Sequence, residues 1–173
     1  FGKFWSFEDI IVEPSCYQLP YPTLWMAAGN HEAIKNVAKK NANLLLDQFS
    51  PLNEVIKRVE LYKSELEKNN FNNDTFNRIA LARALYIAKN KKEKMEVIEK
   101  RMESRSKVDK LSQRPDGRNV SSIMSFKGPD EALNGALIGT EDEIHERLTN
   151  LKENGVGYVL ACHLVGLIPQ SAN

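Results

Sequence analysis

The chain alternates between short continuous apolar runs and stretches in which apolar residues recur every three or four positions. The run TLWMAA at 23–28 has the length of a strand, and NLLLDQF at 43–49 is apolar enough for a buried strand. Between them, Asn30 can cap a short amphipathic helix over 31–40, whose apolar side consists of Ala33, Ile34, Val37 and Ala38. This part of the chain therefore predicts a strand, a helix and a second strand.

The same alternation continues into the next segment. Ser50 and Pro51 predict a helix start, with a capping hydroxyl followed by proline at the first helical position. This helix is expected to reach about Lys68 on an apolar stripe made by Leu52, Val55, Ile56, Val59, Tyr62 and Leu66. In RIALARALYIA, large aliphatic residues then alternate with alanine, which predicts a strand over 78–88 with a roomy face and a tight face.

The last part of the chain is predicted to hold two more helices and one more strand. Residues 90–112 are rich in charge and favour a helix with a solvated outer face, its other side being marked by Met95, Ile98 and Met102. The turn-rich segment 112–131 predicts a long loop. TEDE at 140–143 fits a capping box, Gly155 ends the helix that this box opens, and YVLACH at 158–163 predicts a last buried strand.

Four apolar strands separated by amphipathic helices predict an α/β protein built from parallel βαβ units. This order fits either half of a (β/α)8 barrel or an open doubly wound sheet. The sequence shows no internal repeat. We expect one domain over 1–173, made of an irregular, packed connection (1–22), the first βαβ units (23–89), a charged helix with a long loop (90–139), and the last helix and strand (140–163).

Composition narrows the class of partner. Lys and Arg number 24 against 23 Asp and Glu, a formal net charge of +1, so no nucleic-acid partner is expected. Cys16 and Cys162 lie far apart without CxxC spacing, which predicts packed, reduced thiols. No apolar run reaches the roughly 18–20 residues of a membrane span, and the start lacks the regions of a signal peptide, so we expect a cytoplasmic protein with no membrane partner. Because the chain begins at Phe1, we also expect a fragment or a trimmed product.

The junction between the first strand and the first helix is the main candidate site. Ala28, Gly29 and Asn30 are small or polar, so a ligand can approach the backbone there. The helix start at His31 offers unpaired N–H groups and the positive end of the helix dipole, which favours an anion such as a phosphate. The alternative is an ordinary turn capped by Asn30.

Other candidate residues are more scattered. His163 ends the last predicted strand and can act as an acid, a base or a cofactor neighbour, or simply line a pocket. His31 can touch an anion or face solvent, and His145 is expected on the polar side of its helix. Arg83 interrupts an apolar strand, so a structural ion pair and a site role both stay open. One cationic loop is either a lid over an anionic cofactor or a solvated linker: Arg114, Arg118 and Lys127.

No other sequence motif points to a reaction. The chain shows no metal-ligand spacing, no nucleophile elbow and no glycine-rich phosphate motif. Two blocks nevertheless resemble one family. FWSFEDIIVEP followed by PTLWMAAGNHEAIKNVAKKNANLLL is similar to the C-terminal half of the bacterial luciferase-like, flavin-dependent monooxygenases, and LIGTEDEIHERLTNLKENGVGYVLA resembles the same family near its C-terminus. Members of that family are about twice as long, so the resemblance implies the last four of eight barrel strands.

The resemblance implies the C-terminal half of a (β/α)8 TIM-type barrel that uses reduced FMN, or a deazaflavin in some relatives, and oxygen to oxidise a small organic substrate. It places the flavin phosphate against Ala28, Gly29 and Asn30, with His31 at the same helix start. Many relatives carry a serine where Asn30 stands, so the Asn30 amide is the expected donor here.

The same resemblance extends to partners and alternatives. It adds a flavin reductase and a dimer as further candidate partners, assigns no catalytic residue, and implies that the fragment alone is inactive. The first alternative is a flavin-binding or interaction protein on the same scaffold without turnover. The second is an open doubly wound domain unrelated to flavin.

Overall fold

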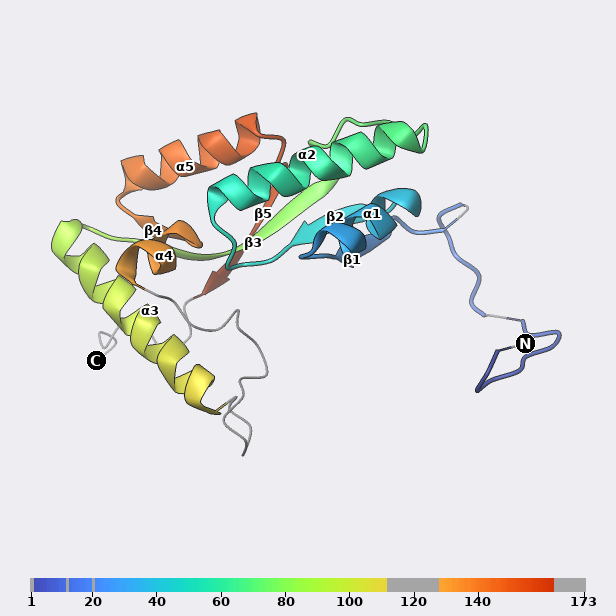
Figure 1. The fold of residues 1–173 in the computed structure, drawn as a ribbon, viewed down its shortest axis with the longest axis horizontal. Helices are drawn as coiled ribbons and strands as arrows, with labels where there is room; N and C mark the ends of the chain where they lie inside the picture. Colours follow the sequence, from blue (N-terminus) through green and yellow to red (C-terminus); the bar gives the residue numbers. More distant parts are fainter. Residues whose placement is uncertain (1, 12, 20, 112–127, 164–173) are drawn as a thin grey trace.

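The computed structural model describes residues 2–11, 13–19, 21–111 and 128–163. These residues form a parallel sheet with helices on both faces (Figure 1). The parallel α/β class expected from the sequence is therefore confirmed. The cationic loop and most of the segment 112–131 lie outside the described residues, and with them Arg114, Arg118 and Lys127.

In the described part of the chain the sheet has five strands, namely β1 (Trp25–Ala27), β2 (Asn43–Leu46), β3 (Ile79–Ile87), β4 (Ala136–Gly139) and β5 (Tyr158–His163). β3 is central: its first three residues pair with β2, its last four with β4, and its middle, Ala80 to Leu85, with β5. Because β5 overlaps both other registers, β2 and β4 lie end to end along the opposite edge of β3. β1 pairs with β2.

The short strand β4 is a difference from the sequence prediction of about four strands. Its four residues, ALIG, are all buried and pair with Ala84 to Ile87 of β3. So short a run carries no periodicity of its own, and its strand conformation depends on the longer neighbour. The long strand β3 thus pairs with two separate strands, β2 and β4, along one edge.

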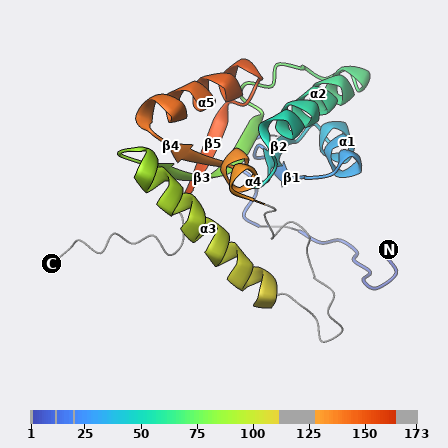
Figure 2. The same ribbon diagram turned by 60° about the vertical axis from the view of Figure 1, so that its left-hand side comes forward.

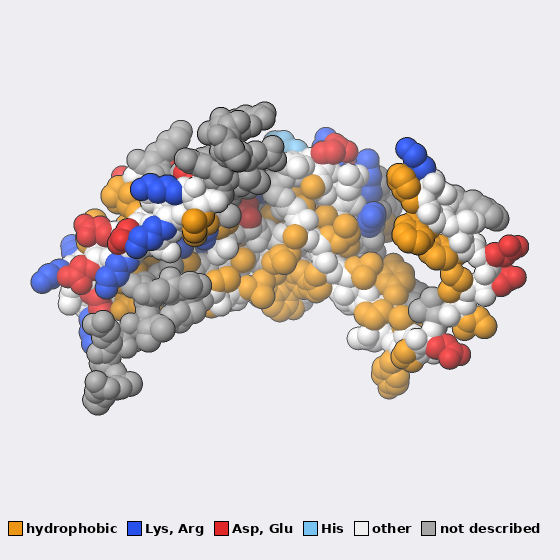
Figure 3. All heavy atoms as spheres, turned by 90° about the horizontal axis from the view of Figure 1, so that it is seen from below, with side chains coloured by type: hydrophobic (Ala, Val, Ile, Leu, Met, Phe, Trp, Pro, Cys, Tyr) orange, Lys and Arg blue, Asp and Glu red, His pale blue; other side chains and the backbone are white. Residues whose placement is uncertain are grey.

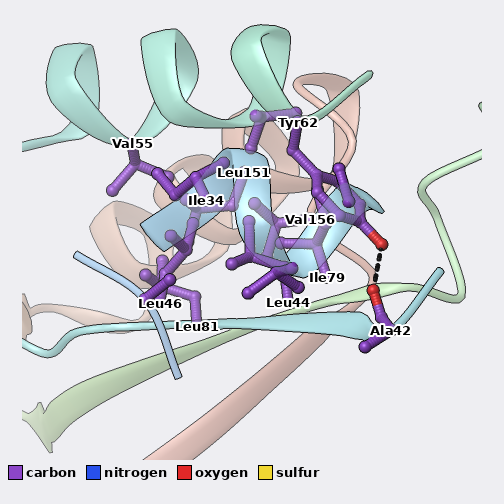
Figure 4. Packing of buried hydrophobic residues seen from close by; sticks show 14 of the residues in the cluster. Ile34, Ala42, Leu44, Leu46, Val55, Tyr62, Ile79, Leu81, Leu151 and Val156 are labelled. Atoms are coloured by element: carbon purple, nitrogen blue, oxygen red, sulfur yellow. Dashed lines mark hydrogen bonds between the residues drawn. The ribbon is translucent and has the colours of Figure 1, made fainter. Parts of the chain in front are cut away.

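Three helices, α1 (His31–Lys39), α2 (Leu52–Lys68) and α5 (Glu141–Glu153), cover one face of the sheet (Figures 1 and 2). We call this the helical face. The helices predicted over 31–40, from Ser50 to Lys68 and after Thr140 are confirmed within a residue or two. Figure 4 shows the cluster beneath them, whose fully buried members include Ile34, Leu44, Leu46, Val55, Val59, Tyr62, Leu66, Ile79 and Leu81.

A polar atom within this cluster is satisfied by the backbone. The Tyr62 hydroxyl donates to Ala42 O at 2.6 Å. Burying an unpaired hydroxyl costs about 1–3 kcal/mol, so this bond lets a tyrosine fill the space between α2 and the start of β2.

Two further helices, α3 (Lys91–Leu111) and α4 (Pro129–Asn134), lie on the other face near the carboxyl end of β3. Their cluster consists of Ala84, Val97, Ile98, Ala132, Ala136 and Ile138. Alternate strand residues point to opposite faces, and Leu81 and Ala84 belong to separate clusters, which places α3 and α4 opposite the helical face. α3 is the charged helix predicted, but Met95 is exposed and Arg101 is buried in its place.

The rest of that second face carries no helix among the described residues, and we call it the bare face. Trp25, Tyr158 and Leu160 are 42%, 47% and 48% exposed there, and the Trp25 and Tyr158 rings meet edge to face with centroids 5.6 Å apart. Figure 3 views the molecule from the side away from α2 and α5 and shows hydrophobic side chains gathered in its middle. The strand predicted as buried over 158–163 is therefore not buried in the described structure, because Tyr158, Leu160 and Ala161 are exposed and Val159 and Cys162 are half-buried.

The segment 1–22 also differs from expectation. Its described residues contain no helix or strand, as predicted, and run away from the sheet (Figure 1). The predicted packing is wrong for these residues, because the following side chains are exposed: Phe4, Trp5, Phe7, Ile10, Ile11, Tyr17, Leu19 and Tyr21.

Candidate functional site

The candidate site lies where β1 passes into α1, at the carboxyl end of the strand. Ala28 is buried, and its N–H donates to Leu45 O of β2 at 3.1 Å. Gly29, Asn30 and His31 follow it and are all exposed. The four residues predicted as cofactor-binding are thus contiguous, anchored at one end by the sheet and open to the surroundings at the other.

Asn30 caps α1 as predicted. Its Oδ1 accepts from Ala33 N at 2.8 Å, and its carbonyl accepts from Ile34 N at 3.0 Å. The N–H groups of His31 and Glu32, and the Asn30 side-chain amide, make no hydrogen bond within the described residues. These donors are free to meet an anion, and the helix dipole favours one there.

A polar network that the sequence analysis missed lies directly beside this junction. A Cβ built on Gly29 would be 4.0 Å from Asp47 Oδ2, at the carboxyl end of the neighbouring strand β2. Asp47 Oδ1 accepts from Phe49 N (2.7 Å) and Ser50 N (2.8 Å), and Oδ2 accepts from Ser50 Oγ (2.7 Å) and Arg58 Nη1 (2.5 Å). Asp47 followed by Ser50 at a strand end is a turn signal, whereas the sequence pattern assigned Asp47 to a buried strand and Ser50 to a helix cap.

The same network explains one wrong prediction. Ser50 was expected to cap α2, but the cap position is Pro51 and makes no side-chain bond. The Ser50 hydroxyl instead donates to Asp47 and accepts from Arg58 Nη1 at 2.8 Å. The carboxylate one turn earlier offers a charge-assisted bond, which is stronger than a neutral helix cap.

Asp47 is held in its charged form. Burial by itself would raise the pKa of this carboxyl, but the Phe49 N–H, the Ser50 hydroxyl and N–H, and the Arg58 guanidinium together lower its pKa to about 2. Because Arg58 balances the charge at contact distance, Asp47 repels an anion at the junction less than a lone carboxylate would.

Arg83 connects this network to β3. Its Nη1 donates to Asp47 O at 2.9 Å and to Ala82 O at 3.1 Å, and its Nη2 donates to Ser50 O at 2.6 Å. Arg83 is 3% exposed, and burial lowers the pKa of its guanidinium to about 10. The structural ion pair considered for Arg83 is not formed within the described residues, and its bonds to backbone carbonyls fix the turn after β2 instead.

The remaining candidates do not join the junction. His145 is exposed on α5, as expected, and His163 is the last residue of β5, paired in register with Leu85. Cys16 and Cys162 are free thiols, but Cys16 is exposed rather than packed. Within the described residues there is no cluster of potential metal ligands, and no helix there is long and apolar enough to cross a membrane.

Solved structures share this arrangement of strands and helices. Monooxygenase RslO1 from Streptomyces bottropensis matches with a TM-score of 0.68 at 20% identity, over 95% of this chain and 47% of its own. A second match is the oxygenating constituent of 3,6-diketocamphane monooxygenase from the CAM plasmid of Pseudomonas putida, in complex with FMN. Its TM-score is 0.59 at 17% identity, and the match covers 82% of this chain and 42% of that protein. A third match is an F420-dependent secondary alcohol dehydrogenase in complex with an F420–acetone adduct. Its TM-score is 0.57 at 9% identity, and the match covers 81% of this chain and 42% of that protein.

At these identities the structural matches establish the fold, and the chain spans less than half the length of each of these proteins. A search among curated proteins found no match. The model of one protein family, described as luciferase-like monooxygenase, matches residues 1–157, which is most of the sequence. The chain therefore belongs to the luciferase-like monooxygenase family.

Proposed function

We propose that this chain supplies the C-terminal half of a flavin-dependent monooxygenase that uses reduced FMN and oxygen to oxidise a small organic substrate. The observation that carries this proposal is the family match over residues 1–157. Two proteins of the same fold support a flavin-type cofactor, since one is in complex with FMN and the other holds an F420 adduct. FMN is the first choice and a deazaflavin the second.

The junction after β1 has the features that the anionic end of such a cofactor needs. Gly29 carries no side chain, so a phosphate can approach the backbone. The N–H groups of His31 and Glu32 and the Asn30 amide have no protein partner among the described residues. We therefore assign cofactor binding to four residues: Ala28, Gly29, Asn30 and His31.

The neighbouring charges are compatible with this assignment. Asp47 is the carboxylate beside Gly29, and its bonds to Arg58 and to two backbone N–H groups compensate its charge. When bound, the reduced flavin supplies the electrons for the reaction with oxygen. The part of this chain is to hold the phosphate and so fix the position of the cofactor at the carboxyl ends of the strands, which is the functional face of such barrels.

A complete site requires more sheet than this chain provides. β1 and β5 each pair with a single strand in the described part, so each leaves one edge open. We propose that a complementary set of strands, on the same or another polypeptide, closes the barrel and completes the substrate pocket. A second copy of the chain and a flavin reductase are the other candidate partners.

The replacement Asn30→Asp tests the cofactor site in the complete protein. Aspartate keeps an oxygen that can cap Ala33 N, so α1 should persist, but its charge would face the phosphate. We expect FMN binding, followed by the change in flavin fluorescence, to weaken about tenfold or more. Asn36→Asp makes the same charge change at an exposed position of α1 and should leave the affinity unaltered.

Unchanged FMN affinity in Asn30→Asp would remove Asn30 from the site. A second candidate function is flavin binding without turnover, which the N–H groups of His31 and Glu32, unpaired within the described residues, would serve equally well. Oxygen separates the two functions: only a monooxygenase consumes reduced flavin and oxygen in step with formation of an oxidised substrate.

A further inference from the structure

A crevice on the helical face is separate from the junction at Gly29. It lies between α2 and α5, at the gap where β2 has ended and β4 has not yet begun along the edge of β3. Its volume is about 140 Å³, and it is lined by Leu52, Arg83, Asn134, Ala136, Leu137, Arg147 and Leu151. Pockets for drug-sized ligands measure roughly 300–1,000 Å³, so this crevice suits a small ion or a single functional group rather than a flavin ring.

Two arginines, Arg83 and Arg147, line this crevice, and some of their N–H groups make no hydrogen bond in the described part of the chain. Arg83 uses three N–H bonds, all to backbone carbonyls. Arg147 donates from Nη1 to Leu133 O at 3.1 Å and to Ala136 O at 2.9 Å. A guanidinium carries five N–H groups, and neither arginine makes a further hydrogen bond among the described residues, so the Nε of both residues and the Nη2 of Arg147 have no protein acceptor there.

The charge of this pair is not neutralised within the crevice. No carboxylate lines it, and the bonded acceptors of both arginines are neutral carbonyls. Asp47 and Glu143 interact electrostatically with Arg83 and Arg147, but each carboxylate is already paired, Asp47 with Arg58 and Glu143 with Lys94 at 2.7 Å. Although burial lowers the pKa of Arg83 to about 10, the group stays protonated at neutral pH. Two partly desolvated cations in one recess favour a shared anion.

We propose that the Arg83–Arg147 crevice binds a small oxyanion of the phosphate or carboxylate type. The anion would sit between the guanidinium of β3 and that of α5, accepting from the free Nε and Nη2 groups. Arg83 holds the turn after β2 and Arg147 holds the carbonyls before and at the start of β4. A shared anion would therefore fasten these two turns together, across the break in the strand edge. This site stands apart from the proposed cofactor site and does not depend on it.

Thermal unfolding of the 173-residue chain in inorganic phosphate tests the site, with ionic strength held constant by sodium chloride. We expect a saturable rise in Tm with phosphate. Sodium acetate in a parallel titration distinguishes a carboxylate ligand from a phosphate. Arg147→Met should abolish the rise, and Lys152→Met, which removes one positive charge from an exposed position of the same helix, should retain it.

Arg147→Met also leaves two carbonyls without a donor, so Arg147→Lys serves as the second variant. Lysine keeps a charge and a donor but loses the forked geometry, and we expect phosphate to bind it at least fivefold more weakly by isothermal titration at a temperature where circular dichroism shows both proteins folded. If neither anion has an effect beyond that of chloride on the wild type, or if Arg147→Met responds to phosphate like the wild type, the proposal is overturned.

Discussion

The two faces of the sheet are built from the same strands but differ in what covers them. On the helical face, Ile79 and Leu81 of β3 are fully buried beneath α1, α2 and α5. On the opposite face the same strand presents Ala80, Ala82 and Ala84, and only its carboxyl end lies under α3 and α4. The large residues thus fill the buried core beneath these helices. The alanines line a face that the described helices cover only at one end.

Within the described residues, helices therefore cover one face of the sheet along β2 and β3 and the other face only near the carboxyl end of β3. Truncating a side chain in a buried core lowers the free energy of unfolding, because the removed atoms leave a cavity. An uncovered apolar surface has little effect on folding but promotes association with other surfaces. The two faces should therefore respond in opposite ways to the same kind of substitution.

The largest effect is expected in the core of the helical face. Leu81→Ala should lower the free energy of unfolding by about 2–5 kcal/mol, since Leu81 is fully buried among residues of three helices. Leu160→Ala removes the same atoms from the bare face, where the side chain is 48% exposed, and should cost less than about 1 kcal/mol. Urea unfolding measures both. Equal losses would mean that the bare face is covered in solution.

The second effect is expected at the edge of the helical face, where Asp47 joins Ser50 and Arg58. Asp47→Asn should lower stability at neutral pH by about 1–3 kcal/mol, because it removes the anionic acceptor of Arg58 and alters the turn. Glu60→Gln, at an exposed position of α2, is the matched control and should change stability by less than about 0.5 kcal/mol.

The same variant has a defined pH dependence. Because the pKa of Asp47 is lowered from 3.8 to about 2 on folding, its contribution is present above pH 4 and is lost as the pH falls from about 4 towards 2. The shift corresponds to at most about 2–3 kcal/mol, and partial solvent screening reduces this contribution. The difference in stability between wild type and Asp47→Asn should therefore shrink over this range. A constant difference would contradict the charge network.

The sequence predicted the helical face well because its signals are local. The stripes of α1 and α2, the Asn30 cap and the glycine end of α5 depend on residues within one or two turns of each other. The alternation of large aliphatic residues with alanine in β3 also predicted the two faces of this strand, without any information about the neighbouring strands. Periodicity and capping are sufficient to predict a helix or strand whose packing partner is the next element along the chain.

The missed features depend on residues distant in sequence. The strand β4 exists through pairing with β3, roughly 50 residues earlier, and Arg83 finds its acceptors more than 30 residues away at Asp47 and Ser50. The packing expected for 1–22 and for both sides of β5 assumed that apolar residues are covered, which the described residues do not achieve. For the candidate site, the sequence located the Asn30 cap but not the carboxylate beside Gly29.

The smallest energetic effect, on association, is expected at the bare face. Apolar surface around Trp25, Tyr158 and Leu160 should lead the chain to self-associate as its concentration rises, which light scattering detects. Leu160→Ser should weaken this association by about fivefold, corresponding to about 1 kcal/mol of lost apolar contact. Leu148→Ser makes the same replacement on the outside of α5, where the side chain is 38% exposed, and should leave the association unchanged. A wild-type chain that stays monomeric across the concentration range would show that the bare face needs no covering. The proposal that a complementary set of strands closes the barrel would then lose its main physical reason.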